Sequence, residues 1–565
     1  MKNILLLLAS ISASTNALAD TYNLIIDEKT VNITGTPTQA TVINGTMPGP
    51  LLRFKEGEEV VINVTNNLDV DSSIHWHGLI VPWQMDGVPG ISYDGIKPGE
   101  TFTYKFTLEQ NGTYWYHSHS AFQEQTGVHA PMIIEPAEAD PVQYDRDYVV
   151  MLADWKDESP EEVYANLKGD AEYYTNPRPT VFDFIKEWFN ADSGEASAQV
   201  VKERASFAKM RMAPTDIVDV TGFTFLMNGQ TADKNWTGTF KAGERIRLRF
   251  INAAAATYFD ISIPGLKMEV VQADGQNLQP VMIDQFNIAI AETYDVVVTP
   301  KEDIAYTVFA QAMDRSGYVR GTLAPKEGMT ASIPEMLPRR VLTLKDVMPG
   351  MSMSGMDMDK ATDKAMSGMQ MDKSAKNMSG MRMNKEPAMN MPAMDSTHNS
   401  AKNSVKTINM SDIKMNMHAS EGMGPKILSY DDLKSLEKTS FNAVADREIT
   451  LRLTGEMDRY IWSFDDQKFD MAEPIYFEFG ERVRVKFVND TMMDHPIHMH
   501  GLWQELQNGS GDYAPKKHTI NVPPKATIIV EVPVDNAGKW AFHCHILYHA
   551  AAGMFREIEV KGGEQ

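Results

Sequence analysis

The chain has 565 residues and a formal net charge of -23 at pH 7, from 76 acidic and 53 basic side chains. This acidity excludes nucleic acid and anionic membrane surfaces as main partners, because both would repel the chain, and it favours attraction of cations. The sequence contains one cysteine, Cys544, so an intramolecular disulfide is excluded and a role as a metal ligand is favoured.

Residues 1–19 have the pattern of a secretory signal peptide. Lys2 precedes an apolar run over residues 4–9, and the small residues Ala17 and Ala19 end the stretch. The stretch is too short for a transmembrane anchor. We therefore expect export to the periplasm and no membrane span in the mature chain.

A strand pattern recurs three times, at residues 57–66, 243–252 and 480–489. Each copy has a turn-forming glycine followed by alternating branched apolar residues. A second repeat relates the ends of the chain, because residues 98–117 have the proline, glycine and histidine spacing of residues 524–543. The equivalent part of the middle copy contains no histidine. Three copies predict three similar antiparallel β-sandwiches, of which the middle one is free of metal.

Two segments interrupt this strand pattern. Within residues 159–209, the stretches 182–189 and 196–209 are helix-like, which predicts an insertion of unknown role in the second domain. From residue 347 onward, nearly half of the chain's 37 methionines stand among Gly, Ser, Asp, Asn and Lys. This composition predicts a disordered insertion before the third domain. Soft thioethers favour Cu(I), so this segment is interpreted as a copper-binding segment or as a flexible linker. Its candidate Cu(I) ligands include Met351, Met353, Met356 and Met358.

Four motifs hold ten of the fourteen histidines, and the last of them contains the lone cysteine. Side chains two residues apart on a strand point to one face, so each His-x-His pair can present two imidazoles to one metal cluster. A thiolate, imidazoles and a distant thioether are the ligands of a blue copper site. If Cys544 faces one copper centre, its two neighbouring histidines face another. The motifs are His75-Trp76-His77, His117-Ser118-His119, residues 495–500 and residues 543–549.

These motifs resemble those of the multicopper oxidases, most closely the bacterial copper-resistance protein A group, over residues 22–560. The resemblance implies cupredoxin domains and four copper ions, one of type 1, one of type 2 and two of type 3. Because matching residues come from both ends of the chain, the three-copper cluster should lie between the first and third domains. The matches to type 1 ligands are His495, Cys544, His549 and the axial Met554. The matches to type 2 ligands are His75 and His498. The matches to type 3 ligands are His77, His117, His119, His500, His543 and His545.

Other residues have two interpretations each. Asp86 resembles the acid that helps to deliver protons beside the family's three-copper cluster, or it forms an ordinary Asp-Gly turn. Met492 and Met493 resemble the methionines that bind Cu(I) before this histidine in bacterial cuprous oxidases, or they form a packed pair. Residues 550–552, all alanine, replace an acid that the family commonly carries there, which puts a proton relay at this position in doubt.

The sequence thus predicts an all-β protein with three cupredoxin-like sandwiches and a disordered methionine-rich insertion before the third. His129 and His518 are expected to be structural or surface residues. The expected limits are residues 1–19 for the signal peptide, 20–140 for domain one, 141–346 for domain two, 347–425 for the methionine-rich segment and 426–565 for domain three.

The favoured function is a periplasmic oxidase that couples one-electron oxidation of Cu(I) to four-electron reduction of O2 to water, for copper tolerance. One alternative is a laccase-like oxidase of phenols, and another is a periplasmic copper-sequestering protein. The expected partners are O2, a Cu(I) or phenolic reductant, and other periplasmic proteins that handle copper.

Overall fold

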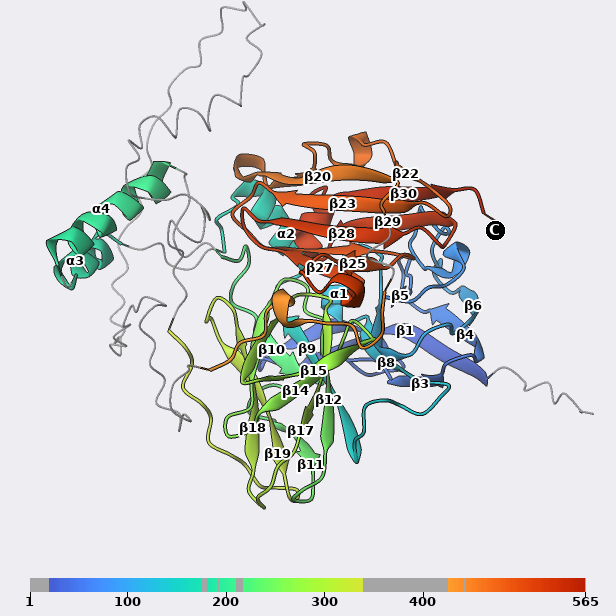
Figure 1. Ribbon diagram of the computed structural model, residues 1–565, viewed down its shortest axis with the longest axis horizontal. Helices are drawn as coiled ribbons and strands as arrows, with labels where there is room; N and C mark the ends of the chain where they lie inside the picture. Colours follow the sequence, from blue (N-terminus) through green and yellow to red (C-terminus); the bar gives the residue numbers. More distant parts are fainter. Residues whose placement is uncertain are drawn as a thin grey trace, which may run out of the picture.

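The computed structural model describes residues 20–174, 180–191, 193–209, 217–338, 425–439 and 444–563. These residues form three units, each with two β-sheets, and a small number of helices (Figure 1). The structure confirms the expected all-β fold of three cupredoxin-like sandwiches. The expected signal peptide and the candidate Cu(I) ligands Met351, Met353, Met356 and Met358 lie outside the described residues.

The first unit pairs the sheet β2-β1-β4-β6 with the sheet β3-β8-β7-β5. Every second residue of β4 is buried, including Val60, Ile62 and Val64, which is the pattern of a strand with one face on the core. The elements are β1 (Asp20–Asn32), β2 (Pro37–Ile43), β3 (Leu52–Lys55), β4 (Glu59–Asn66), β5 (His75–His77), the 3-10 helix η1 (Trp83–Met85), β6 (Thr101–Thr107), β7 (Gly112–His117), α1 (Gln123–Thr126) and β8 (His129–Glu135).

The second unit pairs a six-stranded sheet, β10-β9-β12-β17-β14-β15, with a five-stranded sheet, β11-β19-β18-β13-β16. The strands β12, β17 and β18 are covered on both faces, because the residues along each of them are buried. The strands are β9 (Arg146–Trp155), β10 (Thr224–Met227), β11 (Trp236–Thr239), β12 (Ile246–Asn252), β13 (Phe259–Ser262), β14 (Met268–Ala273), β15 (Gln276–Ile283), β16 (Gln285–Ile288), β17 (Thr293–Val298), β18 (Tyr306–Ala312) and β19 (Tyr318–Ala324).

The described residues between β9 and β10 form three helices, where the sequence predicts an insertion. Helices α3 (Val181–Phe189) and α4 (Gly194–Lys209) confirm the two helix-like stretches, and they project from the body of the molecule (Figure 1). The helix α2 (Pro160–Gly169) was not predicted. It begins with a capping box in which the Ser159 side chain accepts from the backbone of Glu162, and proline occupies its first turn.

The third unit pairs the sheet β21-β20-β23-β28-β25-β26 with the sheet β22-β30-β29-β24-β27. Its elements are η3 (Tyr430–Asp432), β20 (Arg447–Glu456), η4 (Met457–Arg459), β21 (Ile461–Phe464), η5 (Phe469–Met471), β22 (Ile475–Glu478), β23 (Arg482–Asn489), β24 (His495–Met499), β25 (Gln504–Leu506), η6 (Gly511–Tyr513), β26 (Lys516–Lys517), β27 (Thr519–Val522), β28 (Thr527–Pro533), β29 (Gly538–Cys544), α7 (Leu547–Ala551) and β30 (Phe555–Lys561).

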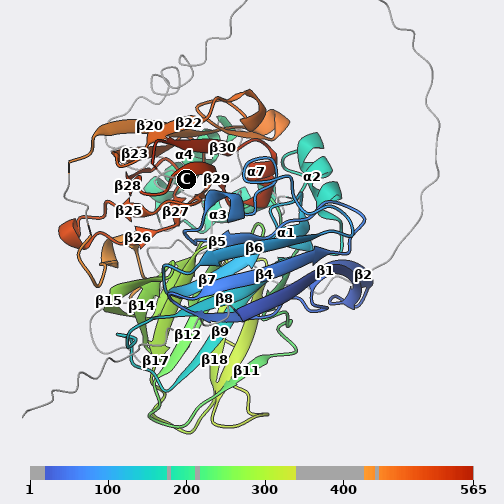
Figure 2. The same ribbon diagram turned by 90° about the vertical axis from the view of Figure 1, so that its right-hand side faces the viewer.

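The first and third units lie side by side, so units far apart in the sequence are neighbours in space (Figures 1 and 2). Buried apolar side chains of the second and third units form one continuous cluster, whereas most of the first unit has a core of its own. The predicted domain limits are not tested by this packing and stay predictions. Within the described ranges, no helix has the length and apolar character needed to cross a membrane.

Candidate metal centre

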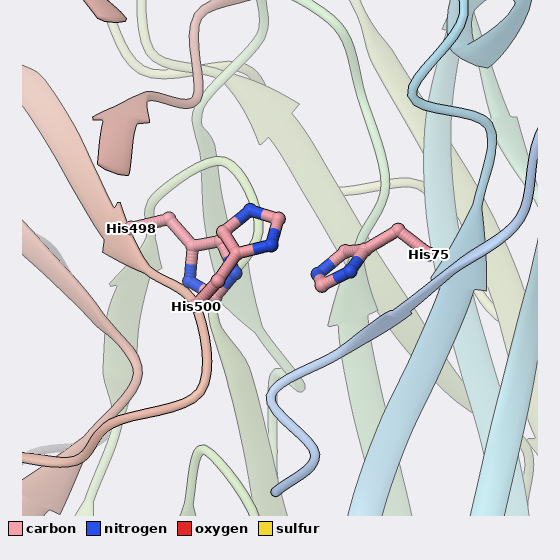
Figure 3. A group of neighbouring side chains, drawn as sticks. All are labelled: His75, His498 and His500. Atoms are coloured by element: carbon pink, nitrogen blue, oxygen red, sulfur yellow. The ribbon is translucent and has the colours of Figure 1, made fainter. Parts of the chain in front are cut away.

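Eight histidines converge where the first unit meets the third. In Figure 3, the rings of His498 and His500 from the third unit face the ring of His75 from the first. Ring centroids are 3.9 Å apart for His75 and His500, and 3.8 Å apart for His77 and His498. All eight are buried except His119, which is part-buried. The eight are His75, His77, His117, His119, His498, His500, His543 and His545.

Strand register places these side chains. In the first unit His75 stands opposite His117, and in the third unit His498 stands opposite His543. Residues alternate between the two faces of a strand, so His495 and Cys544 point to the face opposite that of His498 and His543. The side chains therefore form two separate centres, a histidine cluster and a cysteine centre, which share the strands β24 and β29.

Within the histidine cluster, the first group consists of His75 and His498, and each keeps one ring nitrogen free. The Nδ1 atom of His75 donates to the backbone carbonyl of Asp86 at 2.8 Å, and that of His498 donates to the carbonyl of His518 at 2.8 Å. Both Nε2 atoms are buried, and neither has a hydrogen-bond partner among the described residues. An unpartnered buried polar atom is costly, and a shared metal ion would satisfy both rings.

A second group consists of His119, His500 and His543. The Nε2 atom of His543 lies 3.2 Å from that of His119 and 3.1 Å from that of His500. His500 donates its Nδ1 proton to the Asp86 carboxylate at 2.9 Å, and His543 donates its own to the Cys544 carbonyl at 3.0 Å. Burial lowers the pKa of His500 well below its usual value and that of His543 to about 4. Neutral rings with these tautomers bring two Nε2 lone pairs together, which fits a cation between them.

The third group consists of His77, His117 and His545. His117 donates its Nδ1 proton to the Ser118 carbonyl at 3.0 Å, and the Glu124 carboxylate lies 2.8 Å from the same nitrogen, so the Nε2 lone pair stays free. That atom lies 3.4 Å from Nδ1 of His77, whose own Nε2 faces the Thr519 hydroxyl at 3.4 Å. The Nε2 atom of His545 is buried without a hydrogen-bond partner in the described structure. This group also presents imidazole lone pairs for a metal ion.

The lone cysteine forms a separate centre with two histidines. The Cys544 Sγ atom lies 3.6 Å from Nδ1 of His495 and 3.6 Å from Nδ1 of His549. His495 uses its Nε2 atom toward the Thr491 hydroxyl at 2.7 Å, and His549 donates Nε2–H to the Asp219 carboxylate at 2.6 Å. Both Nδ1 lone pairs therefore point toward the sulfur. Burial raises the pKa of the Cys544 thiol far above its usual value, so a thiolate here requires a cation.

Met554 is held beside this centre by the backbone. Its N–H donates to the carbonyl of His549 at 3.0 Å, and its carbonyl accepts from the N–H of Cys544 at 3.1 Å. The Met554 side chain is fully buried. On another side, the Trp462 ring stacks on His549 with centroids 4.1 Å apart. The arrangement of thiolate, two imidazoles and an adjacent thioether suits copper.

The structure adds two carboxylates that sequence reasoning missed, Asp219 and Glu124. Asp219 comes from the second unit and also accepts from the Tyr460 hydroxyl at 2.7 Å. Glu124 lies on α1, and burial, together with the charge of Asp154, raises its pKa well above the usual value. Asp86, which the sequence singled out, lies against the histidine cluster. Neither missed residue belongs to a motif, and spacing carries no signal for either.

His129 and His518, expected to be structural or surface residues, are both buried. His129 donates through Nδ1 to the carbonyl of Glu124 at 3.0 Å, which supports a structural role. The ring centroid of His518 lies 4.7 Å from that of His77. His518 therefore belongs to the wall of the histidine cluster.

Gly87 fixes the position of Asp86. Its φ is +85°, and a Cβ atom there would lie 1.7 Å from the carbonyl oxygen of Ile74, the residue before His75. Gly90 has a similar φ of +81° but open space around it. We expect Gly90→Ala to cost about 1–2 kcal/mol for the left-handed conformation alone. Gly87→Ala should add about 1–3 kcal/mol for the clash.

Thermal unfolding of both glycine variants measures this difference. Gly87→Ala should also retain less copper than Gly90→Ala, because the clash displaces the backbone that leads into His75. Equal melting temperatures for the two variants would contradict the expected contact.

Comparison with known proteins shows the family to which this chain belongs. Models of the multicopper oxidase family match residues 25–139, 146–333 and 444–564. The chain belongs to the multicopper oxidase family. It is therefore an oxidoreductase that uses O2 as acceptor, and the family implies copper as the cofactor.

Two multicopper oxidase relatives are similar over nearly the whole chain. Copper resistance protein A of Escherichia coli is 47% identical, with 96% of this chain and 92% of that protein covered. A copper resistance protein A homolog of Pseudomonas syringae pv. tomato is 48% identical, with the same shares covered, 96% and 92%. The solved laccase of Botrytis aclada has the same fold, with a TM-score of 0.63 and 20% identity over 96% of this chain and 87% of that one.

Proposed function

We propose that this multicopper oxidase acts in the periplasm and oxidises Cu(I) for copper tolerance. Four Cu(I) ions would each give up one electron, and O2 would take up four electrons and four protons to give two water molecules. One observation carries the proposal: a cysteine centre beside a buried methionine is joined through consecutive residues to a cluster of eight histidines. Relatives named copper resistance protein A support the link to copper tolerance.

The three histidine groups and the cysteine centre support four copper positions. The proposed type 1 ligands are His495, Cys544, His549 and Met554. The proposed type 2 ligands are His75 and His498, whose Nε2 atoms have no hydrogen-bond partner among the residues that the structure describes. The proposed type 3 ligands are His77, His117 and His545 for one ion and His119, His500 and His543 for the other. Bound copper would supply the one-electron redox chemistry and the site of O2 reduction.

Residues of the protein would carry electrons between the two centres and supply protons to the cluster. Cys544 is bonded through the backbone to both His543 and His545, so the two centres are joined by a short covalent path. Asp86 accepts from Nδ1 of His500, and its other oxygen lies 3.3 Å from Nδ1 of His75. We assign Asp86 the task of holding a proton beside the cluster for the oxygen atoms that are reduced there.

The reductant would meet the cysteine centre beside Met493, Asp494 and Asp219, which line a small cavity together with apolar and aromatic side chains. Met493 is buried, Met492 is half-buried, and Asp219 accepts from the Nε2–H group of His549. A soft thioether suits Cu(I), and carboxylates suit the harder Cu(II) ion that its oxidation produces. The methionines of the methionine-rich segment, among them Met351, Met353, Met356 and Met358, would gather Cu(I), and other periplasmic copper-handling proteins would deliver or receive it.

Oxygen uptake by the full, copper-loaded chain tests the proposal, with chelated Cu(I) and a simple phenol as alternative donors. We expect faster uptake with Cu(I), and Met493→Leu should slow uptake with Cu(I) more than uptake with phenol. The matched control is Met268→Leu, which changes a methionine in the core of the second unit. Faster uptake with phenol would favour a laccase-like oxidase. Uptake with neither donor, despite bound copper, would favour a copper-sequestering protein.

A further inference from the structure

The short helix α1 fills the interface between the first and third units, close to α7 (Figure 2). All three of its first residues are buried. The Gln123 amide oxygen accepts from the hydroxyls of Ser72 and Ser118 at 2.7 and 2.9 Å, and that of Gln125 accepts from the Tyr548 hydroxyl of α7. The two Gln123 bonds hold α1 against the first unit and limit the freedom of the neighbouring Glu124 side chain, while the Gln125 bond adds a contact with the third unit.

Glu124 faces two histidines from different units. Its Oε2 atom lies 2.8 Å from Nδ1 of His117, whose N–H donates to the Ser118 carbonyl at 3.0 Å, and its Oε1 atom lies 3.8 Å from Nδ1 of His545. The side chain is 5% exposed, and its Oε1 atom has no hydrogen-bond partner in the described part of the chain. Both histidines belong to the same proposed copper position.

Asp86 has the same relation to a different pair. It joins His75 of the first unit to His500 of the third, through contacts of 3.3 and 2.9 Å. The two pairs of histidines share no residue. Each carboxylate thus spans the interface between units, and each faces the Nδ1 atoms of its two rings, so that in both pairs the Nε2 atoms are left for metal.

We propose that Glu124 is a positioning residue that holds His117 and His545 together across the interface, as a counterpart to Asp86. This inference rests on the copper positions proposed above. A carboxylate that accepts from a ligating imidazole fixes the ring and its tautomer and makes the free nitrogen a better electron donor. Because Glu124 meets rings from both units, it also resists their separation at the place where the cluster is assembled.

Copper retention by Glu124→Gln tests this role in the full chain. The amide oxygen can face the Nδ1 atom of one ring, but the NH2 group then opposes the Nδ1 atom of the other. We expect about 10–100-fold weaker retention of histidine-bound copper in competition with a chelator, a typical loss when such a partner is removed. The blue absorption of the Cys544 centre should remain, because its histidines have other partners, Thr491 and Asp219.

Gln125→Met is the matched control on the same helix, since it removes a buried polar contact that involves no cluster histidine. It should retain copper like the unchanged chain. Equal copper loss in both variants, or none in Glu124→Gln, would overturn the proposal. If Glu124→Gln does not fold, Glu124→Asp provides the second test, because the shorter carboxylate cannot reach both rings and should also lose copper. These readouts use metal content and absorption, so they hold whether the reductant is Cu(I) or a phenol.

Discussion

Cys544→Ser is expected to abolish both the blue absorption and the oxygen uptake of the copper-loaded chain. Serine is nearly the same size, but its hydroxyl is a hard ligand that stays protonated in this buried position, whereas copper in such a centre needs a soft thiolate. His495 and His549 keep their lone pairs directed toward residue 544. Two imidazoles alone should not restore the absorption, because the colour requires the bond to sulfur.

The same variant should keep the copper held by the eight histidines. The hydrogen bonds of the Cys544 sulfur in the described structure go to His495 and His549, which lie outside that cluster, and the His543 side chain contacts residue 544 through its backbone carbonyl. Copper per chain and absorption would be measured together with oxygen uptake. Loss of colour and turnover with most copper retained is the expected result. Turnover that survives with either donor would show that electrons do not enter through the cysteine centre.

The part of the site that could be predicted depends on local periodicity. Alternation along a strand places His498 and His543 on one face and Cys544 on the other, and the structure has this arrangement. The repeat between residues 98–117 and 524–543 predicts that two units contribute alike, and the register of His75 with His117 agrees. Such features follow from the spacing of residues within short stretches of the chain.

The partners of the histidines could not be predicted in this way. Asp219 reaches His549 from another unit, 330 positions away in sequence, and Glu124 meets His545 only because the first and third units pack together. Acidic residues are common in this chain, so their type carries no signal without the packing. The helix α2 is different, because Ser159, Pro160 and Glu162 form a recognisable helix start that sequence analysis could have used.

Asp86→Asn is expected to lower the turnover of the fully copper-loaded chain by about 10²–10⁴-fold, the usual contribution of a positioned proton donor. Asparagine keeps the size of the side chain and can still accept from His500, but it has no carboxyl proton to exchange. Its NH2 group would also face Nδ1 of His75, the ring 3.3 Å from the second carboxylate oxygen. The substitution therefore removes the proton role and weakens the positioning of His75.

Two measurements separate these roles. Loss of positioning appears as copper lost to a chelator, by about 10–100-fold in affinity. Loss of proton delivery appears as slow turnover in chains that still hold all their copper. Asp86→Glu restores a carboxylate at a cost in geometry, so it should recover turnover more than asparagine does. Unchanged turnover in Asp86→Asn would instead support the ordinary Asp-Gly turn, with Gly87 as its structural requirement and Asp86 as a buried acceptor for His500.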